Sequence, residues 1–236
     1  EVAYYSVAIF IATVISVPHR AMHQIMLPLT AQYLNDKNKL ALNDLYKRSS
    51  LNLYVICGFI FLLIINNVNE LYMIIPQEFR NGLIVVFLIS TAKLSDTILG
   101  NNNAILFNSD YYRMVLVFGI ILTVLVVILN MIFIPLYGIN GSAFATFIAI
   151  LVYNTIKIIF VKQKFNMLPF TDKTLKLSIL IVICTFGFYF WDFSFHPVLN
   201  MALKSVLMGF LYIIVIYRMN ISEDISAILK KYLRLN

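Results

Sequence analysis

Two ionisable residues, Lys93 and Asp96, lie inside a run of apolar residues. They are three positions apart, so a helix would place both on one face. Charged side chains within membrane-spanning segments usually face a protein interior or a watery cavity and mark a path for substrate or ions. Two interpretations stay open. The pair lines such a path, where Lys93 attracts an anionic head group, or the two residues pair with each other near the end of the helix.

Four further residues could support a polar path. Arg20 and Arg113 supply positive charge, and Asn101 and Asn130 supply amides that hydrogen-bond polar groups. Asn130 lies within an apolar run, where an amide needs a partner, and a bond to a neighbouring helix would satisfy it as well as a ligand would. The predicted substrate-binding candidates are Arg20, Lys93, Asp96, Asn101, Arg113 and Asn130.

Signatures of an enzyme are scarce. His19 and His23 have the spacing of a zinc-binding helix, but Arg20 stands where a metalloprotease needs a glutamate as general base. The sequence has no glycine-rich phosphate loop, no G-x-S-x-G elbow and no D-x-D pair. We therefore expect no catalytic residue, no bound metal and no cofactor. Cys57 and Cys184 each lie in an apolar run and are predicted to be buried small hydrophobes.

The elements that must position these residues are long apolar runs. Of 236 residues, 61% are hydrophobic and 12% charged, against about 25% charged in a typical soluble domain. The runs are roughly 16 to 21 residues long, which suits a helix that crosses a bilayer and is too long for a buried strand. The predicted fold is all-α, a polytopic integral membrane helical bundle of about seven transmembrane helices. The predicted spans are 2–17, 50–68, 82–100, 114–134, 141–161, 174–191 and 199–217.

Basic residues indicate the orientation of these spans. They gather in the first, third and fifth connections and in the tail, as Lys37, Arg113, Lys157 and Lys230 illustrate, whereas the connection at 135–140 has none. Because basic residues stay on the cytoplasmic side, the first span is predicted to run inward and the C-terminus to be cytoplasmic. This bias explains most of the net charge of +7, and no nucleic-acid partner is expected.

Two connections have structure of their own. Residues 19–34 and 40–49 are compatible with helix and are separated by a turn at 35–38. We expect 40–49 to form a short helix in the cytoplasmic interface, with an ordinary loop helix as the alternative. Residues 138–141 are predicted to form a tight turn, and the small residues that recur every four positions from Gly141 should let a neighbouring helix approach closely.

Several short stretches, in order over residues 20–146, resemble one family. They are Arg20-Ala21-Met22-His23-Gln24-Ile25 with Pro28, Tyr46-Lys47-Arg48-Ser49-Ser50, Ala92-Lys93-Leu94 with Asp96 and Gly100, Tyr111-Tyr112-Arg113, Asn130 with Ile134-Pro135, and Tyr137-Gly138-Ile139-Asn140-Gly141-Ser142-Ala143 followed by Ala145-Thr146. The sequence resembles the polysaccharide biosynthesis exporters, the flippases of lipid-linked oligosaccharides. These belong to the superfamily that also contains the multidrug and toxin extrusion transporters.

The resemblance implies two pseudo-symmetric helical lobes around a central cavity, often with fourteen spans and with both ends cytoplasmic. Residues 1–161 would be helices of the C-terminal lobe, and 162–236 would be two additional transmembrane helices with a cytoplasmic tail. Since the chain enters an apolar run directly after Glu1, we expect a truncated product whose N-terminal lobe is missing.

The resemblance also implies a substrate and a location. The substrate would be a polyprenyl-pyrophosphate-linked oligosaccharide for surface polysaccharide such as O-antigen or capsule. It would be flipped across the bacterial cytoplasmic membrane by alternating access. Membrane lipids, a coupling ion and other polysaccharide assembly proteins are the further expected partners.

Two alternatives to a flippase stay open. A multidrug or cation antiporter of the same superfamily would need carboxylates in its cavity, whereas intramembrane cations are at least as common here. An integral membrane enzyme of glycan assembly would turn over a lipid-linked donor in detergent. The residues favour the flippase.

Overall fold

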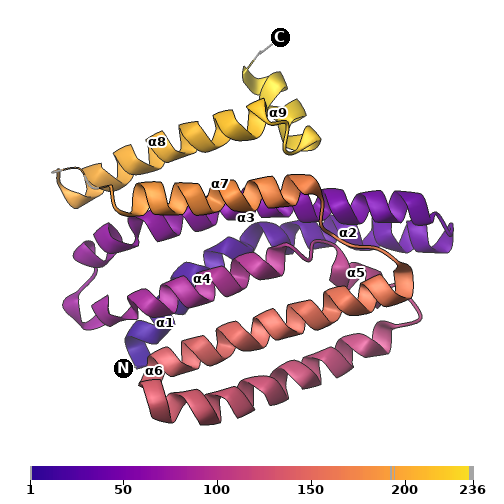
Figure 1. Cartoon of the computed structure of the whole chain (residues 1–236), viewed down its shortest axis with the longest axis horizontal. Helices are drawn as coiled ribbons and strands as arrows, with labels where there is room; N and C mark the ends of the chain where they lie inside the picture. The colour runs from indigo at the N-terminus through magenta and orange to yellow at the C-terminus, as the bar shows by residue number, and fades with distance from the viewer. Residues whose placement is uncertain (1, 192, 194, 234–236) are drawn as a thin grey trace.

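The protein is an assembly of helices that run side by side for much of their length (Figure 1). This computed structural model describes residues 2–191, 193 and 195–233, and within that part every regular element is helical. The all-α class predicted from the sequence is confirmed. The elements are α1 (Val2–Thr13), η1 (Val14–Ser16), α2 (Val17–Asn35), α3 (Lys39–Ile74), η2 (Gln77–Gly82), α4 (Leu83–Thr97), α5 (Asn102–Phe107), α6 (Tyr112–Phe165), α7 (Asp172–Tyr189), α8 (Pro197–Arg218) and α9 (Glu223–Leu233).

Four helical segments of the described chain are long and apolar enough to cross a bilayer. They are Tyr4–Asn35, Lys39–Ile74, Tyr112–Phe165 and Pro197–Arg218. In such a medium a helix is favoured because it satisfies its backbone hydrogen bonds internally. The chain is therefore an α-helical protein suited to a membrane. The predicted spans 82–100 and 174–191 correspond to the shorter helices α4 and α7, of 15 and 18 residues.

The 54-residue helix α6 folds back on itself at Gly138, where φ is 59° and ψ is −136°. Glycine permits this conformation because it has no Cβ. At Gly141 a Cβ would lie 2.0 Å from the backbone oxygen of Phe133, so the two limbs touch there. The predicted turn is confirmed, and the close approach expected at the small residues is made by the first limb of α6. Ala145 and Ala149 are buried as well.

The turn predicted at 35–38 is also confirmed. Helix α2 ends at Asn35, and the Asn38 side chain caps α3 by accepting a hydrogen bond from the Ala41 amide at 3.1 Å. Lys37 lies between them with a left-handed φ of 53°.

The prediction of a separate interfacial helix at 40–49 is wrong. These residues are the first turns of the 36-residue α3, because no glycine or proline lies between its cap and the apolar run that begins near residue 50. Leu42 and Tyr46 do not lie on a membrane surface but are buried in a cluster with Ile105 and Phe118.

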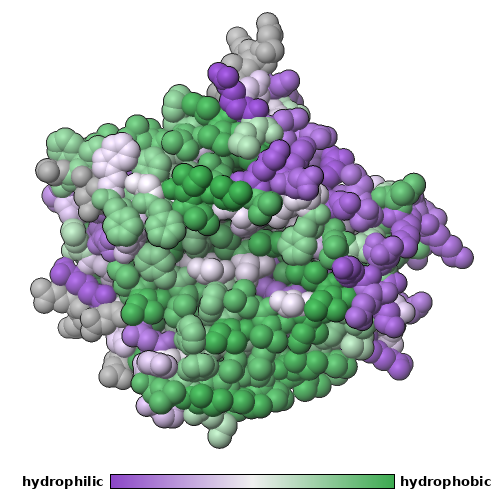
Figure 2. All heavy atoms as spheres, in the orientation of Figure 1, coloured by the Kyte–Doolittle hydropathy of each residue, from purple (hydrophilic) through white to green (hydrophobic). Residues whose placement is uncertain are grey.

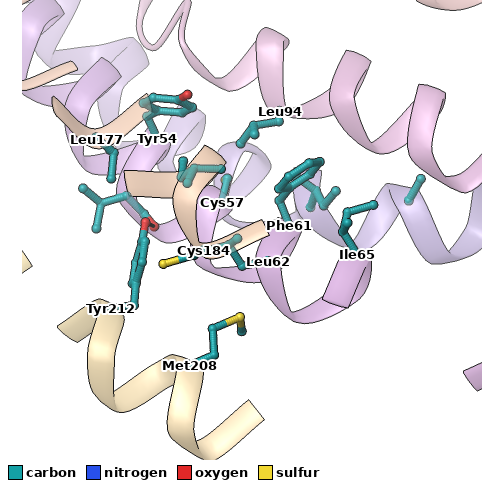
Figure 3. Close-up of a cluster of buried hydrophobic side chains, with 14 of the residues drawn as sticks. Tyr54, Cys57, Phe61, Leu62, Ile65, Leu94, Leu177, Cys184, Met208 and Tyr212 are labelled. Atoms are coloured by element: carbon teal, nitrogen blue, oxygen red, sulfur yellow. Dashed lines mark hydrogen bonds between the residues drawn. The ribbon is translucent and has the colours of Figure 1, made fainter. Parts of the chain in front are cut away.

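The main core forms where α7 and α8 pack on α3 (Figure 3). Cys184 of α7 and Met208 and Tyr212 of α8 belong to one buried cluster with Cys57 of α3. The Tyr212 hydroxyl donates to the backbone oxygen of Val55 at 2.8 Å. Both cysteines are buried and unoxidised, as predicted.

The connections alternate between the two ends of the molecule. The α2–α3 turn, α5, the α6–α7 connection and α9 lie at one end, and the α3–α4 connection, the α6 bend and the α7–α8 connection lie at the other (Figure 1). Figure 2 shows hydrophilic side chains gathered at the first end and hydrophobic ones over most of the remaining visible face. Large apolar side chains are widely exposed, including Leu116 at 70% and Val206 at 68%, which suits contact with lipid. We call the first end, which includes Lys37, Lys164 and Lys173, the basic end.

Polar contacts at the basic end hold α9 in place. Arg48 of α3 forms an ion pair with Asp224 of α9, and the Asn52 amide donates to the same carboxylate at 2.7 Å. Lys173 of α7 pairs with Glu223 at 3.1 Å. Ile225 of α9 also packs against the main core, so α9 is attached to the bundle by both charge and apolar contact.

Gly100→Ala should destabilise the protein. Gly100 has a φ of +50°, and a Cβ there would lie 2.6 Å from the backbone nitrogen of Ser50. Backbone strain of this kind costs about 1–3 kcal/mol, and the clash adds to it. Thermal unfolding in detergent should show a lower midpoint than for Gly119→Ala, where the added Cβ meets open space. Equal midpoints for the two variants would contradict the close approach of α3 to residue 100.

The docking of α9 should weaken in acid. The Arg48 hydrogen bond holds the pKa of Asp224 below its usual value. A carboxylate whose folded pKa is lowered stabilises above its unfolded pKa of about 3.9 and loses that stabilisation as the pH falls through the folded value. Hydrogen exchange in α9 should therefore be constant from pH 7 to 5, after correction for intrinsic rates, and rise below about pH 4. Asp224→Asn should show the faster exchange at every pH. An unchanged pattern in that variant would argue against the contact.

Candidate functional site

A buried lysine is the centre of the polar site near the basic end. Lys157, on the second limb of α6, is 1% exposed. Its ammonium donates to the side-chain oxygen of Asn103 at 2.6 Å and lies 4.8 Å from the centroid of the Tyr153 ring. None of the ion pairs found among the described residues involves it. A neutral amide and an aromatic face therefore surround a full positive charge.

Asp96 of α4 supplies the nearest opposite charge. It interacts electrostatically with Lys157 and Tyr153 of α6 and with His19 of α2. Next to it, the Ser95 hydroxyl accepts a hydrogen bond from the Asn154 amide at 3.2 Å. We define the polar cluster by the residues that share these contacts: His19, Ser95, Asp96, Asn103, Tyr153, Asn154 and Lys157.

The three asparagines after α4 join that segment to three different helices. The Asn101 amide donates to the Thr30 hydroxyl of α2 at 2.5 Å. The Asn102 amide donates to the Tyr46 hydroxyl of α3 at 2.9 Å. The Asn103 side-chain oxygen accepts a hydrogen bond from Lys157 of α6. Helix α5 is short, and these hydrogen bonds hold its start in place where a longer helix would rely on packing.

The polar cluster has acceptor capacity to spare. The side-chain oxygens of Asn101, Asn102 and Asn154 are buried and have no hydrogen-bond partner among the described residues. Buried polar atoms usually find a partner, which can be water or a ligand. This end of the bundle therefore offers unused acceptors beside a cation that forms no ion pair among the described residues.

Two of the predicted site residues belong to this region. Asp96 is a member of the polar cluster, and Asn101 lies two positions before Asn103, another member. Lys93 is half-buried on the same helix as Asp96. The alternative in which Lys93 and Asp96 pair with each other is not seen among the ion pairs of the described residues.

The other predicted residues lie elsewhere. Arg20 is exposed on α2. Arg113 is exposed at the start of α6, where its guanidinium lies 5.6 Å from the Tyr112 ring centroid. Asn130 donates to the Val126 carbonyl of its own helix at 2.8 Å and borders a shallow apolar hollow. The structure does not join these three residues to the polar cluster.

Sequence reasoning missed Lys157 by grouping it with the basic residues of a connection. The helix continues to Phe165, so Lys157 lies within it, three positions after Asn154 and on the same face. A signal was available, because Lys157 falls inside the predicted span 141–161. The helix-to-helix bond that explains Asn154 is present.

A metal centre has no support in the described part of the chain, where no group of three or more His, Cys, Asp or Glu side chains could hold an ion. Comparisons with protein-family models, with curated proteins and with solved structures find no match. The geometry of the polar cluster and the short sequence stretches are therefore what bears on function.

Asn103→Leu should destabilise the protein more than Lys157→Met. Without Asn103 the ammonium stays buried but loses its acceptor, and a hydrogen bond to a charged group is worth about 1.5–3 kcal/mol. Replacing the buried charge itself by an apolar side chain of similar size is often neutral or stabilising. Thermal midpoints in detergent should fall for Asn103→Leu. They should recover in the double variant Asn103→Leu/Lys157→Met. Equal losses in Asn103→Leu and the double variant would show that the hydrogen bond is not what matters.

Proposed function

We propose that the chain belongs to a transporter that flips a polyprenyl-pyrophosphate-linked oligosaccharide across the bacterial cytoplasmic membrane. The observation that carries the proposal is Lys157, buried near the basic end and held by an amide rather than by a contacting carboxylate. A diphosphate that leaves water needs a countercharge, because an isolated anion is unfavourable in a low-dielectric medium. A lysine without a contacting carboxylate can supply it.

The polar surroundings of Lys157 suit the glycan part of such a substrate. Amides and hydroxyls hydrogen-bond sugar hydroxyls, and the oxygens of Asn101, Asn102 and Asn154 have unused acceptor capacity. The apolar exterior of the bundle suits the polyprenyl tail, which would stay in hydrocarbon. The polar cluster would thus bind the polar part of the substrate, and the exterior of the bundle would leave the lipid tail in hydrocarbon.

In this proposal the chain crosses the membrane about seven times. The crossings would be α1 with the start of α2, then α3, α4, the two limbs of α6, α7 and α8. The alternation of connections between two ends supports this topology. Because the basic end would be retained in the cytoplasm, the C-terminus would be cytoplasmic and the lipid-linked substrate would enter from that side.

The sequence stretches that resemble the polysaccharide exporters support the same function. In that family the cavity lies between two lobes, so a second lobe would face this one. The exposed cations Arg20 and Arg113 and the half-buried Lys93 are then candidates to line the cavity, with Asp96, Asn101 and Asn130 as polar supports. Alternating access would move the substrate past them.

Charge-removing variants of the full-length protein test the proposal. Lys157→Met, Lys93→Ala and Arg20→Ala should each reduce surface glycan at least tenfold in a complementation assay, because the pyrophosphate loses a countercharge. Lys162→Met is the matched control, since Lys162 lies on the same limb but is exposed. Protein levels are measured by immunoblot in the same cells.

Reconstitution separates transport from other effects. Purified protein in liposomes should move a fluorescent lipid-linked oligosaccharide to the opposite leaflet, and Lys157→Met should slow that movement. Normal glycan export by Lys157→Met, Lys93→Ala and Arg20→Ala at normal protein levels would refute the assignment. Export of cationic drugs in place of glycan movement would favour the antiporter.

A further inference from the structure

A second buried lysine lies toward the end opposite the polar cluster. Lys204 of α8 is 1% exposed and Glu70 of α3 is 2% exposed, and their ammonium and carboxylate are 2.6 Å apart. The same ammonium donates to the backbone oxygen of Asn66 at 3.2 Å. The Asn200 amide donates to the same carboxylate oxygen, Oε1, at 2.8 Å. This ion pair plays no part in the proposed function.

Three side-chain oxygens on the same stretch of α3 have no hydrogen-bond partner among the described residues. They are Oε2 of Glu70 and Oδ1 of Asn66 and Asn67, all on residues at most 5% exposed. Positions 66, 67 and 70 share one face of α3. That face meets α8, because the Asn66 amide contacts Met208 Sδ at 3.1 Å and the Asn67 amide donates to Ser205 Oγ at 3.0 Å.

The composition of this site resembles the ligand set of a small hard cation. Carboxylate, amide and backbone carbonyl oxygens are the ligands that such ions prefer. Among the described residues one carboxylate, Glu70, balances one positive charge, which favours a monovalent ion over a divalent one. In the structure that positive charge is the ammonium of Lys204, a residue of α8. Its N–H groups donate hydrogen bonds to oxygens that a free ion would coordinate.

We infer that Asn66, Asn67 and Glu70 form a monovalent-cation site in which the Lys204 ammonium takes the place of a free ion, through Glu70 Oε1 and the Asn66 backbone oxygen. The oxygens are arranged on α3, whereas the cation belongs to α8, so displacement of α8 would expose the site to Na⁺. While Lys204 occupies it, a free ion is excluded. The inference concerns α3 and α8 alone and does not rest on the flippase proposal.

Removing the ammonium should create Na⁺ dependence. In Lys204→Met the site keeps its oxygens and one negative charge but loses its cation. Thermal unfolding in detergent is measured in NaCl, KCl and choline chloride at equal ionic strength. Na⁺ at ten times its dissociation constant should raise the midpoint of Lys204→Met by about 3–6 °C over choline, with a saturable dose response. The midpoint of the wild-type protein should not respond to the choice of cation.

Glu70→Gln/Lys204→Met is the matched control. It has the same volume as the pair but contains no buried charge, so it should fold and show no Na⁺ response. The inference is overturned if Lys204→Met responds no more than the wild type, or if the double variant responds equally. It is also overturned if Lys204→Met cannot be recovered folded in NaCl, whether or not the double variant can, because Na⁺ should replace the ammonium.

Discussion

Polar groups inside an apolar helical bundle have to find partners within the protein, because hydrocarbon offers none. Helix α3 is the element on which this requirement falls most heavily. Over its 36 residues it carries Tyr46, which bonds to α5, Asn52, which bonds to α9, and Asn66 and Glu70, which both bond to α8. The packing of α5, α8 and α9 on the bundle follows from these bonds as much as from apolar contact. A purely apolar α3 would leave their polar side chains without partners.

The two buried lysines show how the same side chain can serve opposite ends of one bundle. Lys204 contacts a carboxylate, so its charge is neutralised and it ties α8 to α3. Lys157 contacts an amide and a tyrosine ring, and its nearest carboxylate, Asp96, does not form an ion pair with it in the described residues. The two ammonium groups therefore differ in their partners rather than in their depth. We base the two proposals for these lysines on that difference.

The ends of the molecule differ in a way that follows from its connections. The basic end has long helical extensions and surface ion pairs, such as Arg48 with Asp224. Surface ion pairs each contribute little to stability, so the packing of Ile225 on the main core is needed as well to hold α9. The opposite end has the tight bend at Gly138, where the backbone of Phe133 leaves no room for a side chain on Gly141.

The sequence alone determined the features that depend on local chemistry. Long apolar runs predicted helices, Asn38 and the residues before it predicted the α2–α3 turn, and Gly138 predicted the α6 bend, because each depends on residues close together in the chain. The sequence also pointed to Asp96 and Asn101. The lack of glycine and proline between 39 and 57 is compatible with one continuous helix, but the prediction divided it where polar residues give way to the apolar run. The packing of 40–49 inside the protein, where the Asn102 amide donates to the Tyr46 hydroxyl more than fifty residues away, could not be predicted.

Only the tertiary structure decided which charges are buried and beside what. In the sequence Lys157 is one of several lysines near the end of a predicted span. The structure shows that its ammonium is buried and donates to Asn103 of α5. Glu70 and Lys204 are 134 positions apart, and no spacing pattern joins them. Arg20 and Arg113 were predicted as cations of a substrate path from connections between spans, and the fold leaves both exposed and apart from the polar cluster. A local pattern fixes which face of a helix a residue occupies, but the neighbour on that face is set by packing between distant segments.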